Sequence, residues 1–263
     1  MQFVVVGNPI QHSFSPLLHN YAFQILGICG FYGRYCLEDK KDFACLKDLN
    51  LQGANITIPF KEIAFESCDE VFGIAQKIKA VNTIVFVGDR MLGYNTDAFG
   101  FYQCIQDLGC KNALILGAGG SAKALACILE EKQIETTILN RSMERLEFFR
   151  EFKHCTFDDF TPKYSYDIVI NTTPSGLTND LLPMDRGKLV EILRDAKYAY
   201  DLVYGIDTPF FHLAKECKTF VKDGKEMLIN QAILSFEIFM QSQEIPFDLD
   251  ILKHSMRYIG THL

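Results

Sequence analysis

The stretch LILGAGGSAKALA, residues 114–126, decides the fold. Its first residues form a short apolar run typical of a buried strand, and the residues after Ser121 have the spacing of an amphipathic helix. Gly117, Gly119 and Ala122 give the pattern G-x-G-x-x-A between them. In that setting the first glycine allows a tight turn, the second lets a pyrophosphate approach the backbone, and the alanine permits close packing of helix on strand. An ordinary strand–helix turn is the alternative, but the flanking elements favour a dinucleotide-binding unit.

Strands and helices alternate in the rest of this half of the chain. Residues 136–140 are predicted as a strand and 141–152 as a helix, and apolar runs at 166–174, 198–204 and 218–224 add three strands. Such alternation implies a parallel sheet with right-handed crossovers, that is, a doubly wound α/β domain.

The first hundred residues have a less regular pattern. A strand at 3–6 leads to a helix after Ser15, residues 53–59 form a strand that ends at a proline, and 80–97 form a hairpin around Gly88-Asp89. We therefore predict an α/β protein of two domains. The first is a substrate-binding domain over residues 1–100, onto which C-terminal helices at about 237–263 return, and the second is a Rossmann-like domain over 101–236.

Composition narrows the class of partner. Apolar residues make up 48% of the chain and charged residues 22%, as in soluble globular proteins. The net charge of −7 disfavours binding to nucleic acid, because a protein that binds phosphates needs an excess of Lys and Arg. Nine cysteines without a C-x-x-C pair indicate reduced thiols and no metal site. We see no signal peptide and no membrane-spanning stretch, so we expect a cytoplasmic protein.

The sequence ILNRS, residues 138–142, indicates which dinucleotide binds. NAD sites place an acidic residue at the end of this strand to hold the ribose 2′-hydroxyl. Here Asn140, Arg141 and Ser142 occupy the position, and a guanidinium can pair with a 2′-phosphate that a carboxylate would repel. A surface arginine at a helix start is the alternative. The sequence favours NADP.

Two serines stand at the mouth of the first helix, in GNPIQHSFSP. Ser15 before Pro16 reads as an N-cap, and Gly27 can end the helix. This leaves Ser13 without a role. Because a helix N-terminus carries positive dipole, the two hydroxyls could instead hold a carboxylate.

The strand ANITIPFK has an unusual polar face. Asn55 and Thr57 share it, opposite Ile56 and Ile58, whereas buried α/β strands are usually apolar on both faces. Lys61 follows the strand, and Asn82 and Asp97 lie at similar strand ends. A solvated lysine and a helix-capping aspartate are the alternatives. Together these groups could bind hydroxyls and manage one proton.

Nine motifs follow one another along the chain: GNPIQHSFSP, NITIPFK, AVNTI, GYNTD, LGAGGSAKA, NRS, NTTPSG, DLVY and DGKEMLINQA. By these motifs the chain resembles the shikimate dehydrogenase family over residues 7–232. The resemblance implies an oxidoreductase that reduces 3-dehydroshikimate to shikimate with NADPH, in the biosynthesis of chorismate and the aromatic amino acids. We also expect a cytoplasmic monomer or homodimer with no nucleic acid, membrane or metal partner.

The resemblance also implies roles for individual residues. Lys61 and Asp97 match the catalytic pair. The residues implied in substrate binding are Ser13 and Ser15 at the carboxylate, Asn55, Thr57, Asn82 and Gln231 at the ring hydroxyls, and Tyr204 near the carboxylate. Those implied in NADP(H) binding are Gly117, Ala118, Gly119, Gly120, Ser121, Ala122, Asn140, Arg141, Ser142, Thr172, Thr173, Pro174, Gly224 and Met227. Phe14 departs from the family pattern, where many relatives carry lysine, and predicts at most a weaker affinity for the substrate.

Three other functions fit parts of the sequence. One is a relative that also oxidises quinate or prefers NAD, against which Arg141 argues. Another is a two-domain methylenetetrahydrofolate dehydrogenase, which gives no reason for Ser13, Ser15 or the polar strand. The third is a non-catalytic NADP or metabolite sensor, which could lose Lys61 or Asp97 freely, and both are present.

Overall fold

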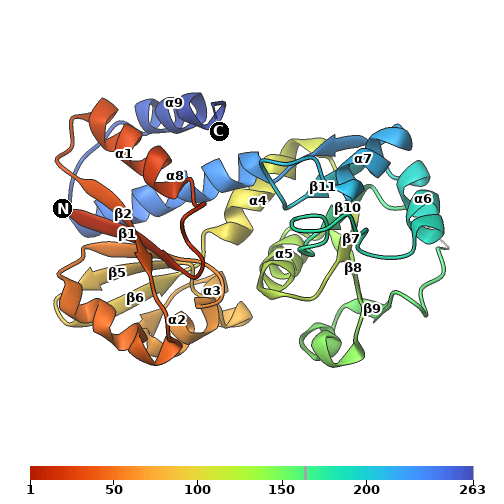
Figure 1. Ribbon diagram of the computed structural model, residues 1–263, viewed down its shortest axis with the longest axis horizontal. Coiled ribbons are helices and arrows are strands. Elements are labelled where there is room, and N and C mark those ends of the chain that lie inside the picture. Colours follow the sequence, from red (N-terminus) through yellow and green to blue (C-terminus); the bar gives the residue numbers. More distant parts are fainter. Residues whose placement is uncertain (163–164, 263) are drawn as a thin grey trace. The chain divides into compact units, whose positions relative to one another are not determined.

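The structure is a computed structural model that describes residues 1–162 and 165–262. The chain forms two compact units, residues 1–100 with 228–263 and residues 101–227. The elements from the N-terminus to α4 are β1 (Gln2–Gly7), α1 (Ser15–Leu26), β2 (Phe31–Cys36), η1 (Lys40–Leu49), β3 (Gly53–Ile56), α2 (Lys61–Ser67), β4 (Glu70–Val71), α3 (Ile74–Ile78), β5 (Thr83–Val87), β6 (Arg90–Tyr94) and α4 (Asp97–Ile105). Those that follow are η2 (Gln106–Leu108), β7 (Asn112–Leu116), α5 (Gly120–Glu131), β8 (Glu135–Asn140), η3 (Met143–Phe149), β9 (Lys153–Thr156), β10 (Ile168–Asn171), α6 (Arg186–Asp195), β11 (Tyr198–Asp201), α7 (Pro209–Glu216), β12 (Phe220–Lys222), α8 (Lys225–Ser242) and α9 (Leu249–Gly260) (Figure 1).

The first unit is built on a mixed sheet in the order β2-β1-β3-β5-β6-β4. β1 pairs in parallel with both β2 and β3, and β5 and β6 form the predicted antiparallel hairpin. Gly88 closes that hairpin at φ 57°, a left-handed conformation that glycine adopts without strain. The helix after Ser15 also ends as predicted, with Gly27 at φ 66°.

Helices α8 and α9 supply much of the apolar core of this unit. Phe236 and Phe239 of α8 pack with Phe3 and Phe23, and all four side chains are at most 2% exposed. α9 packs on α1. The unit takes in the chain from residue 228, not from about 237 as the sequence suggests. The reason is that α8 is unbroken from residue 225, so its first apolar turns already belong to this core.

The second unit has six parallel strands in the order β12-β11-β10-β7-β8-β9. α5 packs on β7 and β8, and α7 packs on β11 and β12. This is the predicted doubly wound fold, and the strand order reverses between β7 and β10. Ligands of such sheets bind beyond the carboxyl ends of the strands at that switch point.

Four elements differ from the sequence prediction. β2 and β9 were not expected, because Gly33 and Arg34 interrupt the apolar residues of β2, and β9 is a strand of 4 residues without a buried side chain. The predicted helix at 141–152 is a 3-10 helix over Met143–Phe149. Ile58 lies beyond β3 and is 73% exposed, since the strand ends at Ile56.

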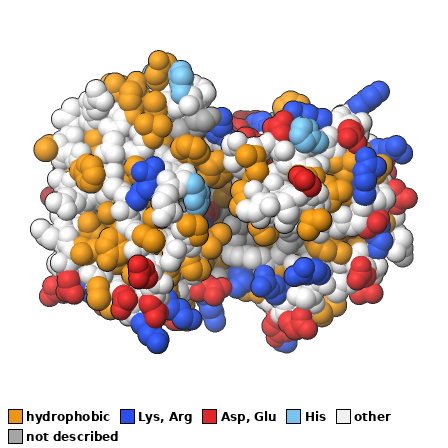
Figure 2. Space-filling view, in the orientation of Figure 1, with side chains coloured by type: hydrophobic (Ala, Val, Ile, Leu, Met, Phe, Trp, Pro, Cys, Tyr) orange, Lys and Arg blue, Asp and Glu red, His pale blue; other side chains and the backbone are white. Residues whose placement is uncertain are grey.

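The surface carries charges of both signs. On the face drawn in Figure 2, acidic and basic side chains both lie over each unit. Within residues 1–162 and 165–262, no helix combines the length and apolar character needed to cross a membrane.

Candidate functional site

Lys61 and Asp97 form a close ion pair in the first unit. Lys61 begins α2 and Asp97 begins α4, and the lysine Nζ lies 2.6 Å from the aspartate Oδ2. Both side chains are mostly shielded, at 21% and 12% exposure. The pair unites an ammonium donor with a carboxylate that fixes its direction, which is a suitable arrangement for handling one proton.

The backbone of α4 is capped by another residue. Asn95 Oδ1 accepts hydrogen bonds from the backbone N–H groups of Asp97 and Ala98, at 3.1 and 3.4 Å. The alternative role of Asp97 as the helix cap is therefore wrong. Because Asn95 supplies the cap, the Asp97 carboxylate remains available to Lys61.

Ser15 does not cap the first helix as the sequence predicts. The helix begins at Ser15, with Phe14 at the N-cap position and no side-chain cap. Ser13 Oγ accepts a hydrogen bond from the Ser15 backbone N–H at 3.4 Å, and the Ser13 carbonyl accepts one from Arg34 at 2.7 Å. Ser15 is thus not the N-cap, because the helical conformation already starts at Phe14. The sequence at the mouth of α1 leaves both hydroxyls beside a helix N-terminus.

Asn55 is deeply engaged with its own protein. Its Oδ1 accepts from the Tyr32 hydroxyl at 2.6 Å, and its Nδ2 lies 2.8 Å from Ser235 Oγ and 3.0 Å from Thr83 Oγ1. These bonds use both amide hydrogens and one oxygen lone pair of a side chain that is 6% exposed. These bonds fix the orientation of the Asn55 amide and leave the second lone pair of Oδ1 for a further donor, so its contact with a substrate hydroxyl stays a prediction. Thr57, by contrast, is half-buried just past the end of β3.

Asn82 and Gln231 meet at Thr96. Asn82 Oδ1 accepts from the Thr96 backbone N–H at 2.8 Å, and its Nδ2 donates to Thr96 Oγ1 at 3.0 Å. Thr96 Oγ1 is also 3.5 Å from Gln231 Oε1 on α8. The residue next to Asp97 thus links two predicted substrate-binding residues.

Sequence reasoning missed the partners of these amides. Thr96 lies inside the motif GYNTD, so its position beside Asp97 was a usable signal. Ser235 lies one helical turn after Gln231, and its hydroxyl is within 3.2 Å of Thr96 Oγ1. Tyr32 gave no signal, because it belongs to the unpredicted strand β2.

In the second unit, the glycine-rich turn follows β7 at the switch point. Gly117 has φ 108°, and a Cβ there would meet Thr172 Oγ1 at 2.6 Å. A Cβ on Gly119 or Gly120 would meet no heavy atom within 4 Å. α5 starts at Gly120, so the backbone that leads into its N-terminus has open space for an anion. Ala122 is fully buried, as close packing of the helix on the sheet requires.

The end of β8 presents a guanidinium to solvent. Asn140 Nδ2 donates to the Ser142 carbonyl at 2.9 Å and shapes the turn between them. Arg141 lies between these two residues. Its side chain is exposed, and among the described residues it forms no ion pair. The turn therefore holds an exposed guanidinium, a group that can pair with a phosphate.

The loop after β10 completes this edge of the sheet. Thr172 Oγ1 donates to the Leu116 carbonyl at 2.8 Å, and Thr173 donates through both its backbone N–H and its hydroxyl to Asn171 Oδ1. Pro174 follows in the same loop. Gly224 donates its N–H to the Val203 carbonyl at 3.2 Å. Burial raises the pKa of Tyr204 above its ordinary value.

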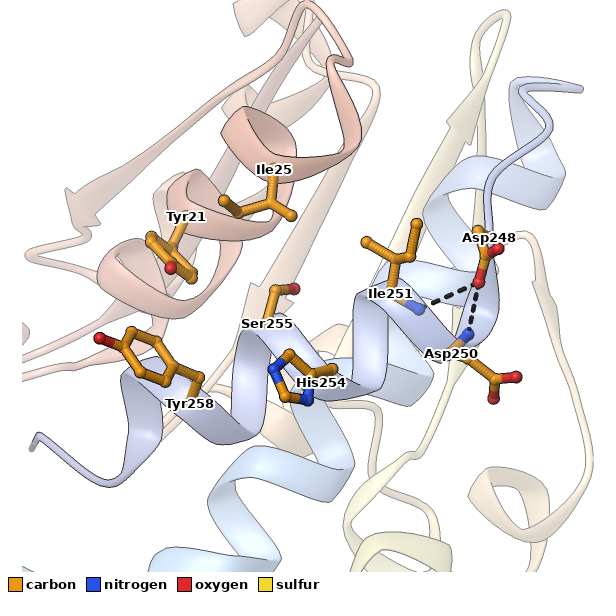
Figure 3. A pocket seen from close by; sticks show the side chains of 8 residues that line it. All are labelled: Tyr21, Ile25, Asp248, Asp250, Ile251, His254, Ser255 and Tyr258. Carbon is orange, nitrogen blue, oxygen red and sulfur yellow. Dashed lines mark hydrogen bonds between the residues drawn. The ribbon is translucent and has the colours of Figure 1, made fainter.

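One cavity of 490 Å³ lies elsewhere, between α1 and α9 in the first unit (Figure 3). Stacked Tyr21 and Tyr258 line it, and Asp248 at its rim caps α9 through the N–H groups of Asp250 and Ile251. None of the predicted site residues lines it. Over the described parts of the chain, no three His, Cys, Asp or Glu side chains gather as a metal site would require.

Comparison with known proteins decides the family. A shikimate dehydrogenase from Helicobacter hepaticus, named as NADP(+)-dependent, is 51% identical over 256 residues, which cover 95% of this chain and 94% of the relative. The chain belongs to the shikimate dehydrogenase family. A second NADP(+)-dependent shikimate dehydrogenase, from Helicobacter pylori, is 48% identical over 253 residues and covers 93% of this chain and 94% of the relative. The family model for the shikimate dehydrogenase substrate binding domain matches residues 5–84.

Solved structures of shikimate dehydrogenases have the same fold. The Thermus thermophilus enzyme, in complex with NADP(H) and shikimate, aligns with a TM-score of 0.82 at 28% identity and covers 98% of this chain and 99% of its own. A chorismate mutase/shikimate 5-dehydrogenase fusion protein from Clostridium acetobutylicum aligns with a TM-score of 0.86 at 27% identity, covering 99% and 97%. The shikimate dehydrogenase fold therefore extends over both units.

Proposed function

We propose that Lys61 and Asp97 are the catalytic pair of an NADP-dependent shikimate dehydrogenase that reversibly reduces 3-dehydroshikimate to shikimate. This oxidoreductase reaction belongs to the shikimate pathway, which leads to chorismate and the aromatic amino acids. The observation that carries the assignment is the shielded ion pair at 2.6 Å, in a chain about half identical to NADP(+)-dependent shikimate dehydrogenases. We assign the unit of residues 1–100 and 228–263 to the substrate and that of 101–227 to NADP(H).

The residues of the second unit fit NADP(H). The open backbone at Gly119 and Gly120 suits the pyrophosphate, since no neighbouring atom fills the space where a side chain would stand. The exposed Arg141 suits the 2′-phosphate. We assign Thr172, Thr173 and Pro174 to the passage of the cofactor, and Gly224 and Met227 to its nicotinamide end.

The bound cofactor would supply the hydride, so the chain's own residues have to orient the ring and stabilise charge on oxygen. The Lys61 ammonium donates a hydrogen bond to the ketone oxygen and delivers a proton as negative charge develops there. Asp97 holds the ammonium in that direction. In the oxidation of shikimate, the proton returns from the hydroxyl to Lys61.

The first unit provides groups for the rest of the substrate. Ser13 and Ser15 hold the carboxylate beside the N-terminus of α1, where the helix dipole favours an anion. Thr57, Asn82 and Gln231 hold the ring hydroxyls. We assign Asn55 to the ring hydroxyls as well, with its amide oriented by bonds to Thr83 and Ser235.

The direct test is reduction of NADP, and separately of NAD, by the purified protein with shikimate and then with quinate. Turnover with shikimate and NADP supports the proposal. Turnover with quinate or NAD keeps the family but contradicts the specificity. A folded protein that binds NADP and turns over neither acid would instead be a sensor.

Two further assignments belong to this proposal. We propose a cytoplasmic location, because all nine cysteines are free thiols and a reducing compartment keeps them so. We also propose that the protein is a monomer or a homodimer and needs no nucleic acid or membrane. Light scattering on a sizing column distinguishes the two oligomeric states, and any larger mass contradicts both.

A further inference from the structure

A buried polar cluster in the second unit has no part in the chemistry described above. Asn171, Asp201 and Thr208 are at most 1% exposed. Asn171 ends β10, Asp201 ends β11, and Thr208 is the N-cap of α7. A charged side chain so deeply buried is costly unless hydrogen bonds satisfy it, which raises the question of what the carboxylate does here.

The Asp201 carboxylate closes the loop of residues 202–208. Its Oδ1 accepts from the Val203 backbone N–H at 3.2 Å, at the start of the loop. Its Oδ2 accepts from the Thr208 hydroxyl, at the end of the loop. One side chain therefore fixes both ends of the segment that carries Tyr204.

The same carboxylate joins this loop to the loop after β10, residues 172–176. We call the latter the cofactor loop, because it holds Thr172, Thr173 and Pro174, which we assign to the passage of the cofactor. Asn171 Nδ2 donates to Asp201 Oδ1 at 3.1 Å, while Asn171 Oδ1 accepts from Thr173. Gly176, at φ 89° in the cofactor loop, packs so closely that a Cβ there would meet Thr208 at 2.8 Å. The loops on either side of Asn171 and Thr208 thus have one common anchor.

Within residues 1–162 and 165–262, no Lys or Arg lies within ion-pair distance of Asp201 to balance this charge. Burial, with a smaller contribution from the negative charge of Asp223 beyond β12, outweighs the hydrogen bonds from Thr208, Val203 and Asn171 and raises the pKa of Asp201 to about 6. Two charged side chains of α7 form ion pairs with residues other than Asp201: Lys215 pairs with Asp207, and Glu216 pairs with Arg186.

We infer that Asp201 is a positioning residue whose ionised carboxylate holds the 202–208 loop closed and so sets the affinity for the substrate through Tyr204. The inference rests on the proposed function and on the place near the substrate carboxylate that the family resemblance implies for Tyr204. Asp201 is 1% exposed, so it acts on the loop only through Val203 and Thr208. The bond from Thr173 to Asn171 does not include Asp201, so we expect the cofactor loop to keep it at either charge of Asp201.

The variant Asp201→Asn isolates the charge. Its amide oxygen can still accept from Asn171 and Val203, but its NH₂ group can only donate to the Thr208 hydroxyl, so the bond that ends the loop reverses its direction and loses its charge. Thr208→Val removes the same bond from the other side, and Thr208→Ser restores it. Asp207→Asn is the matched control, because Asp207 lies in the same loop with an exposed side chain.

The test measures KM for shikimate and kcat at several pH values, together with the Kd of NADPH. At pH 8 we expect Asp201→Asn and Thr208→Val to raise KM by about tenfold, the effect of losing one hydrogen bond to a charged group. The Kd of NADPH stays unchanged, and Thr208→Ser and Asp207→Asn retain the original KM. Below pH 6 the ratio of the Asp201→Asn KM to the original KM falls toward one, since the native carboxyl is then protonated.

Hydrogen exchange of residues 202–208 gives a readout that does not depend on activity. We expect faster exchange in Asp201→Asn than in the unmodified protein at pH 8 and equal exchange below pH 6. A KM ratio of one at pH 8, or one that is raised equally at every pH, overturns the inference and leaves the proposed function intact. Absence of shikimate turnover in the unmodified protein refutes the proposed function, and the exchange result then decides the loop closure alone.

Discussion

The buried charge of Asp201 should be visible in the stability of the protein. Burial raises its pKa from 3.8 to about 6, so the folded state binds this proton more tightly than the unfolded chain does. Its contribution to stability is therefore largest below pH 3.8 and is lost as pH rises through about 6. A pKa difference of about two corresponds to about 3 kcal/mol of unfolding free energy, of which roughly 1.4 kcal/mol is lost between pH 5 and 8.

Asp201→Asn removes this titration while keeping the shape of the side chain. Urea unfolding at pH 5 and at pH 8 gives the free energy of each protein, and all other titrating groups cancel in the difference between variant and unmodified protein. We expect that difference to move in favour of the variant by roughly 1.4 kcal/mol from pH 5 to pH 8. Asp207→Asn should show no such change. A difference that is constant with pH, or that moves against the variant, would refute the reasoning.

Four other substitutions test separate parts of the structure. Lys61→Ala should lower kcat by about 10²–10⁴-fold with an unchanged Kd for NADPH, and an unchanged kcat in steady-state assays removes Lys61 from the chemistry. Arg141→Ala should weaken NADPH binding by about 10–100-fold in a fluorescence titration and leave NADH binding alone, whereas equal losses for both would contradict the 2′-phosphate assignment. Gly117→Ala should destabilise the fold by about 1–3 kcal/mol, because φ is 108° and the new methyl meets Thr172 Oγ1 at 2.6 Å, and a melting temperature that does not fall would argue against that strain. Phe236→Ala should cost about 3–5 kcal/mol in denaturant unfolding, since it empties the centre of the first unit's core, and a loss below about 1 kcal/mol would place the core elsewhere.

Local pattern was sufficient for the elements that carry the cofactor. The apolar strand, the glycine turn and the amphipathic helix at 112–131 lie where the spacing predicts, because each depends on residues adjacent in sequence. Competition between neighbours was not predictable in the same way. Asn95 and Asp97 are both good helix caps, and only the folded backbone shows that Asn95 takes the role.

Long-range partners were beyond the reach of the sequence. Strand alternation predicts that Asn55 and Thr57 share a face, but the bond of Asn55 to Ser235 joins residues 180 positions apart. Tyr32, its other partner, lies on an edge strand without an apolar run. The sequence therefore did not reveal which protein groups hold the Asn55 amide, since those groups come from distant elements, and its contact with the substrate stays a prediction.

The division of the first unit affects how the chain is made. Its core needs Phe236 and Phe239, which follow the whole second unit in the sequence. During synthesis, residues 101–227 can form their sheet as soon as they emerge, because that unit is continuous. The apolar faces of β1 and α1 that pack on α8 and α9 stay exposed to solvent until those two helices have been translated. The nascent chain therefore presents Phe3 and Phe23 to chaperones for most of its time on the ribosome.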